Sequence, residues 1–149
     1  MTNDLPAGLD VDFELTRFLR RVRARALRHL SEIHPKIDYG NFMFLLAIVD
    51  APDGIRGSEL AEDLGVHKST ASRAVSSLER LGLVSRVPDP DDGRAQLLMA
   101  EPVAQERVGA YRRAGHERLL ALLEDWTPEE INLFAASMAR LNDRAEKDF

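Results

Sequence analysis

The chain contains no cysteine, which excludes disulfide bonds, thiolate nucleophiles and cysteine-ligated metals. It also lacks an apolar run approaching the roughly 20 residues that a membrane-spanning helix needs. The first residues show no basic segment followed by an apolar stretch, the pattern of a secretory signal. No internal repeat and no low-complexity tract interrupts the sequence. These absences predict a cytoplasmic protein.

Residue patterns typical of catalysis are also missing. The sequence has four scattered histidines, and these are His29, His34, His67 and His116. They form no His-x-x-x-His pair, and there is neither a phosphate-cradling glycine loop nor a nucleophile elbow. Asp89, Asp91 and Asp92 suggest a metal loop at first sight, but the spaced ligands and terminal glutamate of a calcium loop are absent. The sequence therefore predicts no enzyme, no cofactor and no metal site.

The composition is that of an ordinary globular protein, with 149 residues, 44% of them hydrophobic and 30% charged. A formal net charge of −5 argues mildly against a nucleic-acid partner. The charge is unevenly distributed, however, because seven acidic side chains oppose three basic ones between residues 124 and 149. Between residues 65 and 87 a single acid, Glu79, is outnumbered by Lys68, Arg73, Arg80 and Arg86. The overall charge is therefore no objection to DNA binding.

Four long or apolar segments have helical spacing. Residues 10–33 repeat apolar side chains every three or four positions, and Pro35 ends that helix. A second helix starts near Asp38 and is apolar nearly all round, so it should be buried. Residues 102–124 form another helix, and Thr127 caps a last one. The first helix carries arginines opposite its apolar stripe, and they form either a solvated face or a basic surface: Arg17, Arg20, Arg21, Arg25 and Arg28.

The segment between residues 57 and 100 is the most informative. A short helix, capped by Ser58, ends at a left-handed Gly65, and a second helix opens at residue 67. The second helix has one apolar face, formed by Ala71, Ala74, Val75, Leu78 and Leu81. Its other faces hold the candidate DNA-binding residues, and these are Lys68, Ser69, Thr70, Ser72, Arg73 and Ser76.

Two β-rich runs follow, residues 83–87 and 95–100, joined by a turn-prone segment. Arg94 lies at the tip of this hairpin. Asp92 is placed to anchor the loop or to orient an arginine, and Gly93 permits the turn backbone. Helix, turn, helix and hairpin together predict a mainly α (α+β) fold: a winged helix-turn-helix with a two-stranded wing and long terminal helices.

The chemistry of these side chains suits a DNA duplex. Hydroxyl groups and free N–H groups at a helix start bind phosphate oxygens. Arg73 has the reach and the fork for guanine O6 and N7, or for a phosphate. Arg94 on a thin hairpin suits the negative potential of the minor groove. Taken singly, these residues are better explained as helix caps, solvated charges and a local ion pair. Their order along the chain reverses this and favours DNA.

The runs at residues 64–73 (LGVHKSTASR) and 89–95 (DPDDGRA) resemble the multiple antibiotic resistance regulator (MarR) family. The resemblance covers nearly the whole chain, which it implies is a single domain, residues 1–149. It implies a homodimer whose helical dimerisation region is residues 10–34 and 102–147, with residues 38–100 as the winged DNA-binding region. It also implies a pseudopalindromic operator, with Ser69, Thr70, Ser72 and Arg73 on the recognition helix and Arg94 in the minor groove. His67, where a small capping residue is usual, and residues 98–102 depart from the family pattern.

The apolar stripes of the long helices also predict a dimer. Their apolar surface is larger than the head, the winged helix-turn-helix of residues 57–100, can cover. We expect a transcriptional repressor. Similar proteins respond to small aromatic or phenolic acids, and six residues are candidates for such a cleft or simply for packing: His34, Tyr39, Phe42, Met43, Tyr111 and His116. Two alternatives remain open, a winged helix used for protein contacts and a constitutive DNA binder without an effector.

Overall fold

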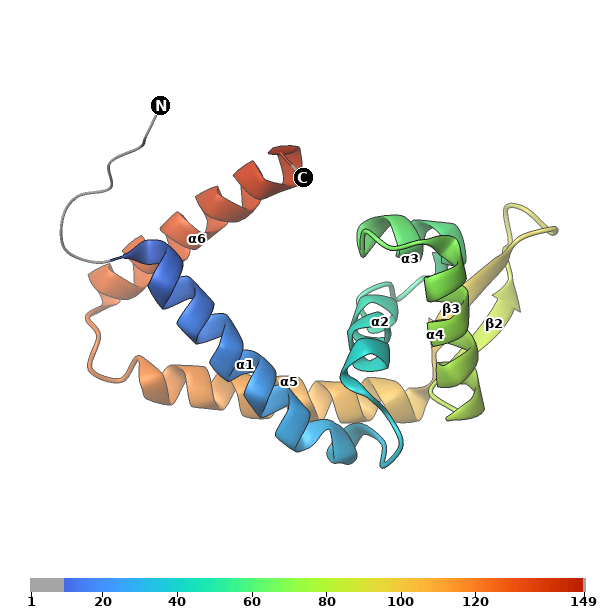
Figure 1. The fold of residues 1–149 in the computed structure, drawn as a ribbon, viewed down its shortest axis with the longest axis horizontal. Coiled ribbons are helices and arrows are strands. Elements are labelled where there is room, and N and C mark those ends of the chain that lie inside the picture. The colour runs from blue at the N-terminus through green and yellow to red at the C-terminus, as the bar shows by residue number, and fades with distance from the viewer. Residues whose placement is uncertain (1–9, 149) are drawn as a thin grey trace. The chain divides into compact units, whose positions relative to one another are not determined.

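The computed structural model describes residues 10–148 and divides into two compact units, residues 1–111 and 112–149 (Figure 1). The first unit contains α1 (Val11–Ile33), α2 (Tyr39–Val49), β1 (Ile55–Arg56), α3 (Gly57–Asp63), α4 (Lys68–Arg80), β2 (Val84–Pro88) and β3 (Gln96–Ala100). The unit boundary falls inside α5 (Pro102–Leu122), and α6 (Pro128–Asp148) completes the second unit. Within residues 10–148, no helix is long and apolar enough to span a membrane. The predicted fold class, a mainly helical winged helix-turn-helix, is confirmed.

Side-chain caps fix where the first two helices begin. The Asp10 carboxylate accepts a hydrogen bond from the Phe13 N–H (3.0 Å), and α1 ends at Ile33, two residues before Pro35. The Asp38 carboxylate accepts from the Asn41 N–H (2.8 Å) at the start of α2. Both boundaries agree with the sequence, because an acidic N-cap satisfies otherwise unpaired amides and proline disfavours helix before it.

The sheet has three antiparallel strands in the order β1-β3-β2, one more than the sequence predicted. β2 and β3 pair from Val84 with Ala100 to Pro88 with Gln96. β1 adds two residues on the other side of β3, with Ile55 opposite Leu98. The two-stranded wing thus continues at its base into a three-stranded sheet. In Figure 1 the loop joining β2 and β3 extends away from α2, α3 and α4.

The hydrophobic core of the first unit joins the C-terminal half of α1 to α2, α3, α4 and the sheet, and also to the start of α5. Its largest fully buried side chains are Phe42, Ile33, Leu45, Ile48, Leu60, Leu78, Leu83, Leu98, Val75 and Val108. Phe42 packs edge-on against Tyr111, with ring centroids 5.1 Å apart. Arg107 of α5 donates a 2.7 Å hydrogen bond to the carbonyl oxygen of Ile33. The end of α1 and the start of α5 are therefore joined directly.

The second unit is the later part of α5 followed by α6. Thr127 and Glu130 form the expected capping box: the Thr127 N–H donates to Glu130 Oε2 (2.8 Å), and the Glu130 N–H donates to Thr127 Oγ1 (3.2 Å). Trp126 packs edge-on against Phe134, with centroids 5.6 Å apart. This unit exposes many large apolar side chains: Leu119, Leu120, Leu122, Trp126, Leu133, Phe134 and Leu141.

Candidate nucleic-acid interface

The turn between α3 and α4 is built around Gly65. Its φ is +63°, a left-handed conformation that favours glycine. The Val66 N–H donates to the Ala61 carbonyl (2.9 Å), which closes the end of α3. The predicted break is therefore confirmed. The predicted cap at Ser58 is wrong, because α3 has already begun at Gly57: Arg56 is the N-cap residue, and its N–H donates to Glu59 Oε2 (3.0 Å).

α4 has distinct inner and outer faces. Ala71, Ala74, Val75 and Leu78 are buried against the head, as their spacing predicted, whereas Leu81 is only half-buried at the C-cap. Every candidate DNA-binding residue on this helix is exposed, and these are Lys68, Ser69, Thr70, Ser72, Arg73 and Ser76. The packing of α4 therefore leaves its polar face available to a partner.

The N-terminus of α4 begins with His67 as an extended N-cap residue whose side chain makes no capping hydrogen bond. The His67 carbonyl accepts from the N–H groups of Thr70 and Ala71 (2.9 and 3.1 Å). The amides of Lys68 and Ser69 come before this first helical bond, as at any helix start. Such amides, with the Ser69 and Thr70 hydroxyls, suit an anionic oxygen. Arg73 stays close to this turn, since its Nε lies 3.3 Å from the Ser69 carbonyl.

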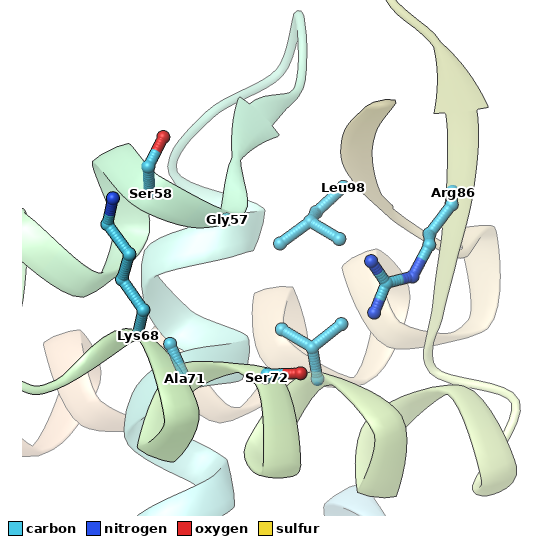
Figure 2. Close-up of a pocket in the computed structure, with 8 residues that line it drawn as sticks. Gly57, Ser58, Lys68, Ala71, Ser72, Arg86 and Leu98 are labelled. Atoms are coloured by element: carbon cyan, nitrogen blue, oxygen red, sulfur yellow. The ribbon is translucent and has the colours of Figure 1, made fainter. Parts of the chain in front are cut away.

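A hollow of about 120 Å³ separates the first turn of α4 from the sheet (Figure 2). Lys68 and Arg86 flank it on opposite sides, and Ser72 lies between them. Arg86 also donates to Glu79, with Nε 2.9 Å from Oε1, so β2 is tied to α4. The same arginine lines a second hollow on the wing together with Arg94. Arg86 thus joins the outer face of α4 to the wing tip, a role the sequence analysis did not assign.

Hydrogen bonds within the wing turn place Arg94. The Ala95 N–H donates to the Asp92 carbonyl (2.8 Å), and the Arg94 N–H donates to Asp92 Oδ1 (3.2 Å). Asp92 therefore anchors the loop backbone, and the Arg94 side chain is exposed. Gly93 does not have the role expected of it. Its φ lies outside the left-handed region, and a Cβ there would meet nothing within 4 Å, so the turn does not require glycine.

Asp89 is the one charged side chain that is buried in the part of the chain that the structure describes, at 5% exposure. Its Oδ1 accepts the Asp91 N–H (2.9 Å), and its Oδ2 accepts Nε of Arg56 (2.8 Å) and also Nη2 of that guanidinium. The Asp91 N–H, followed by the Arg56 side chain, holds the pKa of the Asp89 carboxyl below its ordinary value. Asp89 raises the pKa of Arg56 in turn. This pair could not be recognised from the sequence, because 33 residues separate its members.

The candidate ligand-cleft residues have clear packing contacts. Phe42 is buried and Tyr111 half-buried in their mutual contact, and Tyr39 lies under the Arg23 guanidinium, 5.1 Å from ring centroid to Cζ. Nδ1 of His34 accepts the Lys36 N–H (3.1 Å).

The remaining two candidates, Met43 and His116, are exposed, and His116 belongs to the second unit. Arg25 departs from the expected solvated arginine face: it is half-buried, with Cζ 5.7 Å from the Tyr111 ring centroid. Between residues 10 and 148, no group of three histidine, aspartate or glutamate side chains could hold a metal ion.

Comparison with known proteins fits this geometry. A family model described as the MarR family matches residues 37–95, the stretch from just before α2 into the wing. The HTH-type transcriptional regulator YxaD of Bacillus subtilis (strain 168) is 30% identical over 142 residues, covering 95% of this chain and 96% of the relative. The chain belongs to the MarR family. The regulator YybA of the same strain is also 30% identical, over 85% of each chain.

Solved structures of the MarR family share the fold. A crystal structure of MarR is 27% identical, covers 93% of this chain and 99% of its own, and has a TM-score of 0.70. A putative MarR-family regulator from Listeria monocytogenes, complexed with a 26-mer DNA, has a TM-score of 0.73 at 21% identity, covering 95% and 92%. This family and fold are those of DNA-binding transcription regulators and not of enzymes.

Proposed function

We propose that this MarR-family protein is a homodimeric repressor that binds a pseudopalindromic operator in the cytoplasm, with α4 in the major groove and the wing in the minor groove. One observation supports this most strongly: α4 buries Ala71, Ala74, Val75 and Leu78 on one face and leaves the opposite, polar face exposed, including Ser69, Thr70, Ser72 and Arg73. Such a helix suits the direct reading of bases, because it offers amide and hydroxyl donors for phosphates and an arginine for a guanine.

The wing extends the proposed surface. Arg94 is exposed at its tip, and Arg86 lies between that tip and α4. A protein-docking wing would instead be expected to expose apolar side chains. Because lysine and arginine release counterions from DNA, binding should weaken steeply as the salt concentration rises.

The dimer is supported by apolar surface that has no cover within one chain. α1 exposes Val11, Phe13, Phe18, Leu19, Val22 and Leu27, and the second unit exposes a similar set. Exposed apolar area of this extent usually marks an interface, and a two-fold pair is the commonest solution. We assign the interface to residues 10–34 and 102–147 and the DNA-binding head to residues 38–100. Two heads would then meet half-sites about 10 base pairs apart.

Ligand control is a separate part of the proposal. In the first unit, Tyr39, Phe42 and Tyr111, with Met43 and His34, are the candidate contacts for a small aromatic or phenolic acid; in the second unit the candidate is His116. Such a ligand would release the operator only by favouring one spacing of the two heads over another. A titration with a panel of aromatic acids, monitored as loss of operator binding, separates this mechanism from a constitutive binder.

Sedimentation and operator binding test the proposed function. The protein is expected to sediment as a dimer and to protect two half-sites in a footprint of genomic fragments. Arg73→Ala and Arg94→Ala should each weaken binding while the dimer stays folded, whereas Lys36→Ala, an exposed cation outside both the assigned interface and the head, is the control. If Arg73 reads a base, its loss should reduce the ratio of operator to random-DNA affinity, by about tenfold. A monomer, or a protein that binds no duplex at low salt, contradicts the proposal.

A further inference from the structure

The ion pair between the partly exposed Arg56 and the buried Asp89 links the start of α3 to the first residue of the wing turn. Asp89 directly follows β2, and its carboxylate receives Nε and Nη2 of Arg56 on one oxygen and the Asp91 N–H on the other. Both carboxylate oxygens are therefore engaged, one by a neighbouring amide and the other by a side chain 33 residues away. The pair connects the helix-turn-helix to the loop that holds Arg94.

Arg56 is itself fixed by its backbone. It pairs with Leu97 in the sheet, and this strand pairing does not depend on the Glu59 side chain. Its guanidinium therefore projects from a rigid site. On the other side, the Asp89 N–H donates to the Ala95 carbonyl (3.1 Å), which closes the turn that contains Arg94. A continuous series of contacts thus runs from α3 through Arg56 and Asp89 to the wing tip.

An ion pair that takes a charge out of water adds little net free energy to folding. Burying a carboxylate requires strong compensation, and a well-packed apolar pair of similar size is often at least as stabilising. What an arginine fork offers is direction, because its hydrogen bonds fix the angle at which two groups meet. A loop held in its bound orientation loses less conformational freedom when it binds.

We propose that Arg56 and Asp89 are a positioning pair, which holds the wing turn at a fixed angle to the helix-turn-helix and so presents Arg94 to DNA. This inference rests on the proposed DNA-binding function and adds residues that do not themselves touch the duplex. Neither side chain is on the outer face of α4. Their effect on affinity passes through Arg94.

Two double-mutant cycles on an operator duplex test the pair. Arg94→Ala should weaken binding in the wild type but have an effect smaller by about tenfold when Arg56→Met is already present. The effect of Arg73→Ala should be the same in both backgrounds. Arg56→Lys, which keeps the charge but loses the fork, should restore part of the Arg94 contribution. Independent effects of Arg56 and Arg94, or equal coupling of Arg56 to Arg73 and to Arg94, overturn the proposal.

Glu59→Ala is the matched control. It removes the hydrogen bond at the Arg56 N–H and weakens the start of α3, but it leaves the guanidinium on Asp89. Arg94→Ala should weaken operator binding by the same factor in Glu59→Ala as in the wild type. Coupling of the same size would mean that any softening of the head displaces the wing, which contradicts a specific role for the pair.

A measurement without DNA separates this inference from the proposed function. Because the chain has no cysteine, Gly93→Cys gives a single site for a nitroxide label at the wing turn. The label should become more mobile with Arg56→Met and stay unchanged with Glu59→Ala. An unchanged label in Arg56→Met overturns the pair even if DNA binds normally. If the label responds as expected but the wild type binds no duplex, the proposed function fails and the role of the pair in DNA binding fails with it.

Discussion

Arg86 in β2 and Glu79 in α4 form an ion pair that joins the wing to α4, with Nε 2.9 Å from Oε1 and Nη2 3.3 Å from Oε2. Both side chains are about one-third exposed, at 37% and 31%. Water screens such a pair, so it contributes little to stability. Its position beside Lys68 and Ser72 gives it more influence on the charge that the proposed DNA surface presents.

Opposite effects are therefore expected from the two members of this pair. Arg86→Gln should weaken DNA binding and lower the slope of log affinity against log salt by about one, because one phosphate contact is lost. Glu79→Gln should strengthen binding, because it frees Arg86 and removes a negative charge. Fluorescence anisotropy across a salt series measures both. Equal slopes for Arg86→Gln and the wild type would show that Arg86 stays bound to Glu79 in the complex.

Acid should selectively weaken the protein at Asp89. The folded-state pKa of this carboxyl lies below its unfolded value, because the Asp91 N–H and then Arg56 favour the charged form. Its contribution to the free energy of unfolding is therefore complete above the unfolded pKa of about 4 and is lost as pH falls through the folded value. Asp89→Asn should be less stable than the wild type at neutral pH.

The difference between the wild type and Asp89→Asn should shrink as the pH drops below about 4. Asn cannot accept from both Asp91 and Arg56, because one of its two polar atoms is a donor. Urea unfolding at a series of pH values from neutral to acid measures the difference. A gap that stays constant over the whole range contradicts the assignment.

Gly54 should tolerate no side chain. Its φ is +88°, and a Cβ there would lie 2.7 Å from Sδ of Met99 and 2.9 Å from Cβ of Leu97. Gly54→Ala should therefore lower the free energy of unfolding by about 2 kcal/mol. Gly57→Ala is the matched control, since a Cβ at Gly57 meets nothing within 4 Å and φ is unremarkable. A thermal melt of both variants decides the prediction, and equal melting temperatures would refute it.

The two faces of α4 should separate stability from binding. Leu78 is fully buried, so Leu78→Ala should cost about 3 kcal/mol of unfolding free energy. Ser76→Ala on the exposed face should change stability by less than about 0.5 kcal/mol but reduce operator affinity. Chemical denaturation and a binding assay on the same samples measure both. Loss of stability in Ser76→Ala would mean that this face packs against the protein itself.

The sequence predicted the elements whose signals are local. The spacing of Ala71, Ala74, Val75 and Leu78 specifies the inner face of α4, and Asp38 and Thr127 carry helix-capping chemistry that depends on neighbours three residues away. The left-handed Gly65 is similarly local. Each of these features is decided within one or two turns of the chain, so pattern alone identifies it.

Features that depend on distant partners were not predictable. β1 has only two residues, too few for any periodicity, and exists because Ile55 and Arg56 meet β3. The same pairing starts α3 one residue before the expected cap at Ser58. Asp89 looked like one of several aspartates in a polar turn, and only Arg56, brought by the fold, gives it a distinct environment. Arg86 was recognised as a charge but not as the residue between α4 and the wing.

The hydrogen bond from Arg107 to the Ile33 carbonyl has a consequence for how such proteins can be rebuilt. It joins the last residue of α1 to a residue near the start of α5. The segment between these two residues therefore begins and ends at neighbouring points in the structure. A segment with adjacent ends can be exchanged without stretching the scaffold that receives it. Residues 34–106 therefore form a segment that can be exchanged between family members. In such a chimaera the terminal helices of one member would carry the operator preference of another.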